Sequence, residues 1–237
     1  MEIALILVMI VIIIFVLIER RNRILITKAN ERLLLKILPY KVAEQLKAGQ
    51  ETIVSEEEAS VLFIDIVKFT EMTFKLGSKE TVRVLGGLFD MFDDLTVTYG
   101  VEKIKTIGDS YMVVSGLPEA SADHPIRLAD FALAAREDVQ IFNKKNQMNL
   151  QVRMGMACGK VVAGVIGHKK YVYDTWGDVV NVASRMESTG VPGEIQLSES
   201  IEQLLAEKFI CEPRSEEINV KGKGIMKTYF LRGRREA

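Results

Sequence analysis

Two aspartates stand where carboxylates could bind a metal ion. Asp65 lies at the end of the apolar run "SVLFID", and Asp109 follows Gly108 between the strand-like segments "VEKIKTI" and "YMVVSGL". A right-handed strand–helix–strand crossover makes its two strands parallel, so their carboxyl ends meet at one edge of the sheet. Mg²⁺ is usually held in proteins by one or two carboxylates together with substrate phosphates. The two aspartates therefore predict a metal site at that edge.

The alternative interpretation is a pair of ordinary turn aspartates. Asp is favoured in turns because its side chain bonds to nearby backbone, and this interpretation suits Asp109, which directly follows Gly108. It suits Asp65 less well, because a carboxylate inside "LFIDIV" costs several kcal/mol to bury unless it is paired or metal-bound. Asp65 is therefore the stronger candidate for a metal ligand.

The elements that must hold these residues follow from the alternation of apolar and polar segments. We expect an α+β fold with a ferredoxin-like β-α-β-β-α-β core and additional antiparallel strands. Glycines at the turns and helix ends mark most of the boundaries. The predicted elements are a strand at "SVLFIDIVKF", a helix over 78–98, a hairpin of "VEKIKTI" and "YMVVSGL" joined by Gly108 and Asp109, a helix at "HPIRLADFALAAREDVQIFNKKN", separate strands at "LQVRMGMACG", "KVVAGVIG" and "YVYDTWG", a helix at "DVVNVASRMESTG", and strands at "EIQLS" and "VKGKGIMKTYFLRG" around a short helix over 198–208.

The first residues differ sharply from the rest. Residues 3–18, "IALILVMIVIIIFVLI", are uninterruptedly apolar, and "ERRNR" follows at once. A run near the lower limit of about 17 residues predicts a transmembrane helix at 1–18. Arg20, Arg21 and Arg23 would keep the downstream chain in the cytoplasm, which predicts a single-pass plasma-membrane protein. A cleaved signal peptide is the alternative, but Glu2 replaces the usual positive charge and no A-x-A-like site follows.

A charged, helix-favouring segment connects this run to the main domain. Residues 19–50 carry apolar side chains at irregular helical spacing until Pro39 interrupts the pattern. Their apolar surface predicts a linker or coiled-coil helix that pairs with a second copy, and packing on the chain's own domain is the alternative. The polar stretch "KAGQETIVSEEEAS" then precedes a catalytic domain predicted at 57–233.

Composition excludes several classes of function. The 31 Lys and Arg residues balance 32 Asp and Glu residues, so no basic field indicates a nucleic-acid partner. Cys158 and Cys211 are far apart and lack CxxC or Cys/His spacing, which argues against a zinc site or a disulfide framework. The absence of a GxxxxGK[ST] motif excludes a P-loop enzyme.

Four blocks of sequence resemble the class III nucleotidyl cyclases, the family of adenylate and guanylate cyclases. The blocks are "FIDIVKFT", "EKIKTIGDSYMVVSGLP", "YDTWGDVVNVASRMESTG" and "NVKGKGIMKTYFL", and they occur in the family's order between about residues 57 and 233. The resemblance implies conversion of a nucleoside triphosphate into a 3′,5′-cyclic monophosphate and pyrophosphate. It also implies two Mg²⁺ or Mn²⁺ ions per site, and a homodimer in which each site combines residues of both chains.

The resemblance assigns metal and base-selecting roles to residues of this chain. Asp65 and Asp109 match the family's metal-binding aspartates, and the carbonyl of Ile66 would assist them. Lys105 and Asp174 match the pair that selects the base. Adenine offers an exocyclic amine as donor and N1 as acceptor, which Asp174 and Lys105 complement. The guanylate branch carries Glu and Cys at these places, so the pair predicts ATP as substrate and an adenylate cyclase, with a guanylate cyclase as the alternative.

The same resemblance assigns roles at the phosphates and the ribose. Asn181 matches the residue that orients the ribose, and Arg185 matches the one that stabilises the charge developing on the α-phosphoryl group. Lys221 lies at the position that holds the triphosphate tail. Lys160 is a weaker candidate for a phosphate contact, and Lys68 departs from the Gly of many relatives.

Two further alternatives fit the sequence less well than a cyclase. Another palm-type nucleotidyl transferase would also use paired carboxylates, but nothing here resembles its GG[DE]EF loop. A non-catalytic, membrane-tethered dimerisation module should have lost metal or transition-state residues, yet every one is present in this chain. An active cyclase therefore remains the main prediction.

Overall fold

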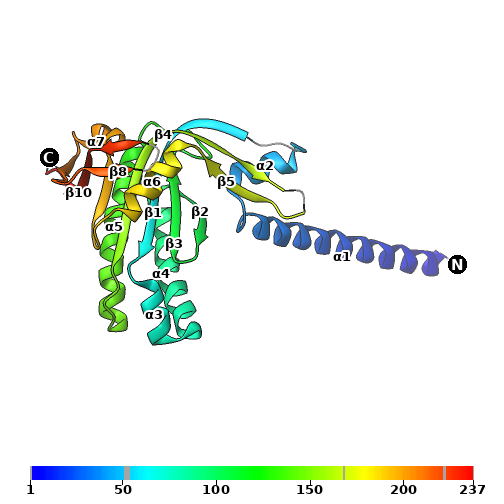
Figure 1. Ribbon diagram of the computed structural model, residues 1–237. Helices are drawn as coiled ribbons and strands as arrows, with labels where there is room; N and C mark the ends of the chain where they lie inside the picture. The colour runs from blue at the N-terminus through cyan, green and yellow to red at the C-terminus, as the bar shows by residue number, and fades with distance from the viewer. Residues whose placement is uncertain (1, 51–53, 168, 221–222, 237) are drawn as a thin grey trace. The chain divides into compact units, whose positions relative to one another are not determined.

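The structure is a computed structural model that describes residues 2–50, 54–167, 169–220 and 223–236 (Figure 1). For residues 2–8 and 11 only the backbone is described. Contacts divide the chain into two compact units, Met1–Glu51 and Thr52–Ala237.

The N-terminal unit consists of two helices. Helix α1, Glu2–Leu34, continues without a break across the boundary predicted between residues 18 and 19. Helix α2, Tyr40–Lys47, begins directly after Pro39, whose ring cannot continue a preceding helix. Lys47 forms ion pairs with Glu31 on α1 and, at 2.9 Å, with Glu44 on α2. The predicted linker is therefore the second half of α1 followed by a short second helix.

The described residues contain no helix that is long and apolar enough to cross a membrane. The prediction of a single-pass plasma-membrane protein with a cytoplasmic domain is therefore wrong, and the predicted transmembrane helix at 1–18 and membrane anchoring are not supported.

The larger unit is built on a sheet of eight strands. Seven of them follow the order β2-β3-β1-β4-β6-β10-β7, and β5 pairs with β4. Neighbours are antiparallel except β4 and β6, which are parallel, so the predicted α+β class with a mixed sheet is confirmed. The strands are β1 Val54–Ile66, β2 Glu102–Ile107, β3 Ser110–Ser115, β4 Val152–Ile166, β5 Val172–Trp176, β6 Ile195–Ser198, β7 Phe209–Pro213 and β10 Thr228–Arg234, with β8 Ile218–Val220 and β9 Gly224–Met226 as a separate hairpin.

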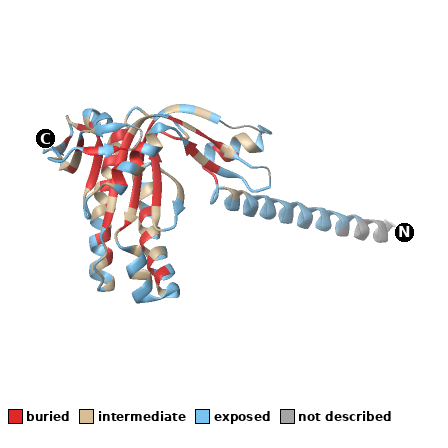
Figure 2. Cartoon of the chain, in the orientation of Figure 1, coloured by how far each residue is buried: buried red, intermediate tan, exposed pale blue. Residues whose placement is uncertain are grey.

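Helices cover both faces of this sheet. Buried side chains concentrate in its strands and on the helix faces toward them (Figure 2). Met154 and Met156 belong to the main core together with residues of α4 and α5, whereas Gly155 between them touches α6. Successive strand residues point to opposite faces, so α6 lies on the face opposite α4 and α5. The helices of this unit are α3 Phe69–Leu76, α4 Ser78–Tyr99, α5 His124–Asn146, α6 Asp178–Ser188 and α7 Glu199–Leu205.

The predicted hairpin places the two candidate aspartates at one edge. Ile107 pairs with Ser110, so Gly108 and Asp109 form the predicted two-residue loop, and Gly108 has a φ of 64°. Strands β1 and β2 both run antiparallel to β3, and they are therefore parallel to each other. Asp65, at the end of β1, accordingly lies at the same edge as the loop after β2.

Two strands are longer than the sequence pattern predicts. Strand β4 runs continuously through Gly155, Gly159 and Gly164, whereas the pattern predicts two strands that separate at Gly159. Its pairing with β1 extends from Val152 to Gly164, so neighbouring backbone holds the glycines in the strand. Strand β1 likewise begins at Val54, within the stretch interpreted as a polar boundary.

Candidate active site

Asp65 is close enough to Asp109 to affect its ionisation. Burial raises the pKa of the Asp109 carboxyl, and the neighbouring negative charge of Asp65 raises it further. Two carboxylates that repel each other at a sheet edge are stabilised by a cation between them. The structure thus brings together the two residues that the sequence predicts as metal ligands.

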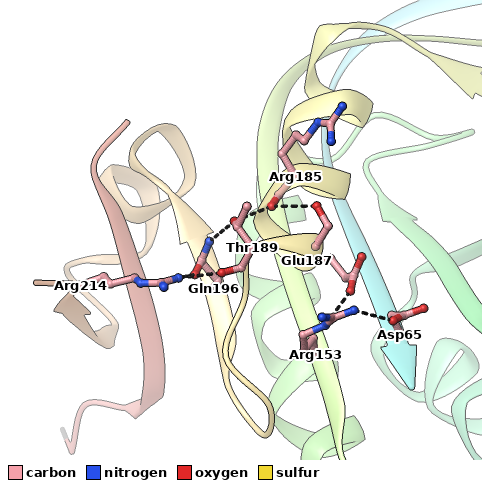
Figure 3. Close-up of polar contacts among 8 residues, drawn as sticks. Asp65, Arg153, Arg185, Glu187, Thr189, Gln196 and Arg214 are labelled. Atoms are coloured by element: carbon pink, nitrogen blue, oxygen red, sulfur yellow. Dashed lines mark hydrogen bonds and ion pairs between the residues drawn. The ribbon is translucent and has the colours of Figure 1, made fainter. Parts of the chain in front are cut away.

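A third residue of this cluster, Arg153, escapes the sequence analysis. It lies on β4 directly opposite Asp65 on β1. Its Nη2 donates to Asp65 Oδ2 at 2.9 Å, and its Nε donates to Glu187 Oε1 on α6 at 3.1 Å (Figure 3). Arg153 and Asp65 are 88 residues apart in the sequence. Only the register of β1 against β4 reveals the contact.

Glu187 is a buried carboxyl on the sheet-facing side of α6. Burial raises its pKa to about 7, Asp65 adds to this through its negative charge, and Arg153 opposes it. The helix approaches the sheet so closely here that a Cβ at Gly155 would lie 1.9 Å from the backbone nitrogen of Glu187. Gly155 is therefore required for the close approach of α6 to β4. The apolar face of α6, with Val182 and Met186, was the signal that could have placed Glu187 inward.

The donors at this edge fit a divalent ion that also binds a substrate. Among the described residues, His, Cys, Asp and Glu side chains form no group of three or more that could hold a metal ion. Asp65, Asp109 and the carbonyl of Ile66 are hard oxygen donors, which suit Mg²⁺ or Mn²⁺ when substrate phosphates complete the coordination. The fit is therefore to a divalent metal ion whose coordination a phosphorylated ligand completes.

The two residues predicted to select the base are in direct contact. Lys105 on β2 donates from Nζ to Asp174 Oδ2 on β5 at 2.5 Å. The other oxygen, Oδ1, accepts the backbone N–H of Thr175 at 2.8 Å. The pair is partly exposed, at 35% for the lysine side chain and 17% for the aspartate. A donor and an acceptor are thus held side by side within reach of a ligand.

Helix α6 exposes the residues predicted to act on the ribose and the phosphate. Asn181 and Arg185 are both exposed, one helical turn apart, while Val182, Ala183 and Met186 are buried. In Figure 3 the Arg185 guanidinium points away from Asp65. Within one chain, Arg185 therefore does not face the candidate metal site.

Hydrogen bonds fix the C-terminal end of α6. Thr189 donates from Oγ1 to the Arg185 carbonyl at 2.6 Å, and Gln196 donates from Nε2 to Thr189 Oγ1 at 3.0 Å. Arg214 Nη1 donates to the Thr189 carbonyl at 2.8 Å and to Gln196 Oε1 at 2.6 Å (Figure 3). The helix that carries Asn181 and Arg185 is thus attached to the sheet and to the segment after β7.

A family model for the adenylate and guanylate cyclase catalytic domain matches residues 52–233. The chain belongs to this family. The prediction that it carries a nucleotidyl cyclase catalytic domain is therefore confirmed. Cyclase domains of this family bind a nucleotide, use divalent metal ions and act as dimers.

Similar proteins include both adenylate cyclases and guanylate cyclases. The cyclase is 46% identical over 210 residues to an adenylate cyclase of Mycobacterium bovis, a match that covers 88% of this chain and 47% of that protein. It thus spans about half the length of that relative. A solved guanylate cyclase domain of RhGC from Catenaria anguillulae, in complex with GTP, is 37% identical with a TM-score of 0.73, covering 76% of this chain and 100% of that one. The adenylyl cyclase CyaB from P. aeruginosa is 25% identical with a TM-score of 0.73, covering 78% of this chain and 98% of that one.

The three remaining lysine candidates reveal less about the site. Lys221 lies outside the described residues. Lys160 is exposed on β4 and lies 3.4 Å from Glu56, a surface ion pair. Lys68 precedes α3 and adopts left-handed backbone with a φ of 58°, which a side chain disfavours and glycine tolerates. The departure from glycine noted in the sequence is therefore a strained position.

Proposed function

We propose that this chain is the catalytic domain of an adenylate cyclase, which converts ATP into 3′,5′-cyclic AMP and pyrophosphate. The observation that carries the proposal is the contact between Lys105 and Asp174. Lys105 supplies a donor for N1 of adenine, and Asp174 supplies an acceptor for its exocyclic amine. Guanine presents the opposite pattern, so its donor would face the donor Lys105. The adenylate cyclase of Mycobacterium bovis supports the same preference.

The reaction needs little covalent chemistry from the protein. The ribose 3′ oxygen bonds to the α-phosphorus and its proton passes to solvent water. The bond from that phosphorus to the oxygen bridging to the β-phosphate breaks, and its electron pair leaves with pyrophosphate. Asp65, Asp109 and the Ile66 carbonyl would hold two Mg²⁺ or Mn²⁺ ions, which lower the pKa of the attacking hydroxyl and neutralise phosphate charge. Asn181 orients the ribose, and Arg185 stabilises the negative charge that builds on the α-phosphoryl group.

The base preference is tested by exchanging the pair. We expect Lys105→Glu combined with Asp174→Cys to lower the rate with ATP and raise the rate with GTP, because the donor becomes an acceptor. The measurement is a competition between ATP and GTP with Mn²⁺, in which both cyclic products are quantified. A double variant that kept the ATP preference would show that these residues do not select the base. Formation of no cyclic nucleotide by the parent protein would favour the non-catalytic alternative.

We infer that each site is shared between two chains of a homodimer. Arg185 points away from Asp65 within one chain (Figure 3), which supports a site in which a second chain supplies its own Arg185. A two-fold symmetric pair provides two equivalent sites, since the same surfaces meet twice. Asp65 and Asp109 of one protomer would face Lys105, Asp174, Asn181, Arg185 and Lys221 of its partner.

Mixing two inactive variants tests this arrangement. Asp65→Ala and Asn181→Ala should each be inactive alone, whereas a mixed dimer has one fully parental site. With random pairing at equal concentrations, about half of the dimers are mixed, so activity should recover to about a quarter of the parental value. Subunit exchange is verified with differently tagged chains. No recovery despite exchange would show that each site is built within one chain.

A further inference from the structure

The Arg153 side chain joins a candidate metal ligand to helix α6. Its guanidinium group donates from Nη2 to Asp65 at 2.9 Å and from Nε to Glu187 at 3.1 Å. All three side chains are largely buried, at 30% exposure for Arg153, 19% for Asp65 and 10% for Glu187. A planar guanidinium that bonds two carboxylates through different nitrogens fixes the orientation of both. The position of Asp65 therefore depends on where Glu187 is held.

Glu187 is a firm anchor for that guanidinium group. Its backbone packs against β4 at Gly155, where there is no room for a Cβ. The helix end next to it is bonded to Gln196 and Arg214 through Thr189. The contacts that run from Glu187 through Arg153 to Asp65 thus begin at a fixed part of the domain.

We propose that Arg153 is a positioning residue that orients the metal-binding carboxylate of Asp65, with Glu187 as its support; this rests on the proposed function. The bond engages Oδ2 of Asp65, and the other carboxylate oxygen points away from Arg153 (Figure 3). Residues that hydrogen-bond a metal ligand commonly change metal affinity by about 10–100-fold when mutated. Arg153 has this relation to Asp65, and its role is to hold one oxygen so that the other faces the ion.

A charge-conserving exchange separates positioning from simple electrostatics. Arg153→Lys keeps the positive charge and loses the fork that holds both carboxylates. Arg214→Lys is the matched control, because Arg214 belongs to the bonds around α6 and its bonds go to Thr189, Gln196 and Glu216. Binding of Mn²⁺ alone is followed through the electron paramagnetic resonance signal of the free ion, and thermal unfolding is recorded in parallel.

We expect Arg153→Lys to weaken Mn²⁺ binding by about tenfold and Arg214→Lys to change it by less than about twofold. The Mn²⁺ concentration that gives half-maximal cyclase activity should rise with the dissociation constant in Arg153→Lys, while kcat at saturating Mn²⁺ largely recovers. Equal Mn²⁺ affinity in Arg153→Lys and the parent would overturn the proposal. So would equal weakening in both variants, because Arg153 would then act only through the general stability of α6.

A second pair of variants keeps the test valid if Arg153→Lys does not fold. Glu187→Gln retains an oxygen that accepts the Arg153 Nε bond, whereas Glu187→Ala removes it. We expect Glu187→Ala to weaken Mn²⁺ binding severalfold and Glu187→Gln to remain close to the parent. Identical Mn²⁺ affinities in the two variants would contradict a relay through Glu187.

One further comparison separates this inference from the proposed function. Asp65→Ala should abolish most of the Mn²⁺ binding if the metal assignment is right. Unchanged binding in Asp65→Ala would reject the metal site itself. Lost binding in Asp65→Ala together with unchanged binding in Arg153→Lys would reject only the positioning role.

Discussion

Gly155→Ala gives the sharpest structural test of how α6 is placed. A Cβ at this position would lie 1.9 Å from the Glu187 backbone nitrogen and 2.4 Å from the Met186 carbonyl carbon. Real Cβ atoms essentially never approach other heavy atoms within 3.0 Å, so the helix must move by about 1.1 Å. The obstacle is backbone on both sides, which cannot rotate out of the way as a side chain can.

The expected effects are a loss of stability and a larger loss of rate. Overpacking of this kind typically costs about 1–3 kcal/mol of unfolding free energy, and in a domain of this size each kcal/mol lowers Tm by about 2–4 °C. Because α6 carries Asn181 and Arg185, a shift of about 1 Å should reduce cyclic AMP formation by about 100-fold. Thermal unfolding and the Mn²⁺-ATP assay measure the two effects separately.

Gly86→Ala is the matched control for this substitution. Gly86 lies within α4, and a Cβ there would meet nothing within 4 Å. Alanine in a helix interior should therefore raise stability by about 0.5–1 kcal/mol and leave the rate unchanged. If Gly155→Ala kept the parental Tm and rate, the contact between α6 and β4 would not be as close as described. A lowered Tm with a parental rate would show that α6 does not position the catalytic residues.

Two further predictions concern strain and pH. Lys68→Gly should raise the unfolding free energy by about 0.5–1 kcal/mol, because glycine relieves the left-handed backbone at φ 58°. Chemical denaturation measures this free energy, and an unchanged or lower value would contradict the strain at Lys68. Burial raises the pKa of the Glu102 carboxyl from 4.5 to about 7, so its contribution to stability is fully present below about pH 4.5 and is lost as the pH rises through 7. At about 1.4 kcal/mol per pKa unit, the loss of unfolding free energy approaches about 3 kcal/mol. The stability of Glu102→Gln relative to the parent should therefore rise between pH 5 and pH 8. Equal pH profiles of the two proteins would contradict the burial of a titrating Glu102.

The meeting of Asp65 and Asp109 at one edge of the sheet was predictable because local pattern and topology agree there. Asp65 closes an apolar strand and Asp109 lies in a two-residue turn, and a crossover rule then brings strand ends together without knowledge of side-chain contacts. Lys105 and Asp174 came only from the resemblance to a family. Their contact depends on how β5 folds back along β4, which periodicity does not reveal.

Other features were hidden because they depend on tertiary pairing. Arg153 looks like an ordinary polar residue of a strand until β1 and β4 are in register. Gly159 suggested a strand end but lies within a paired strand, and the space that Gly155 leaves for α6 is not visible in the sequence. The apolar N-terminal run predicted a membrane span, but α1 continues through charged residues to Leu34 and no described helix meets the requirement for a span.

If Lys105 and Asp174 select the base as proposed, their ion pair makes base recognition an exchange of partners. Each residue already satisfies the other before a nucleotide arrives, at 2.5 Å. Adenine can replace this contact by accepting from the lysine and donating to the aspartate. A base of reversed polarity would also break the contact but would leave both charges without a suitable partner, which costs more than the pair itself contributes. The contact that weakens binding of the correct base therefore strengthens rejection of the wrong one.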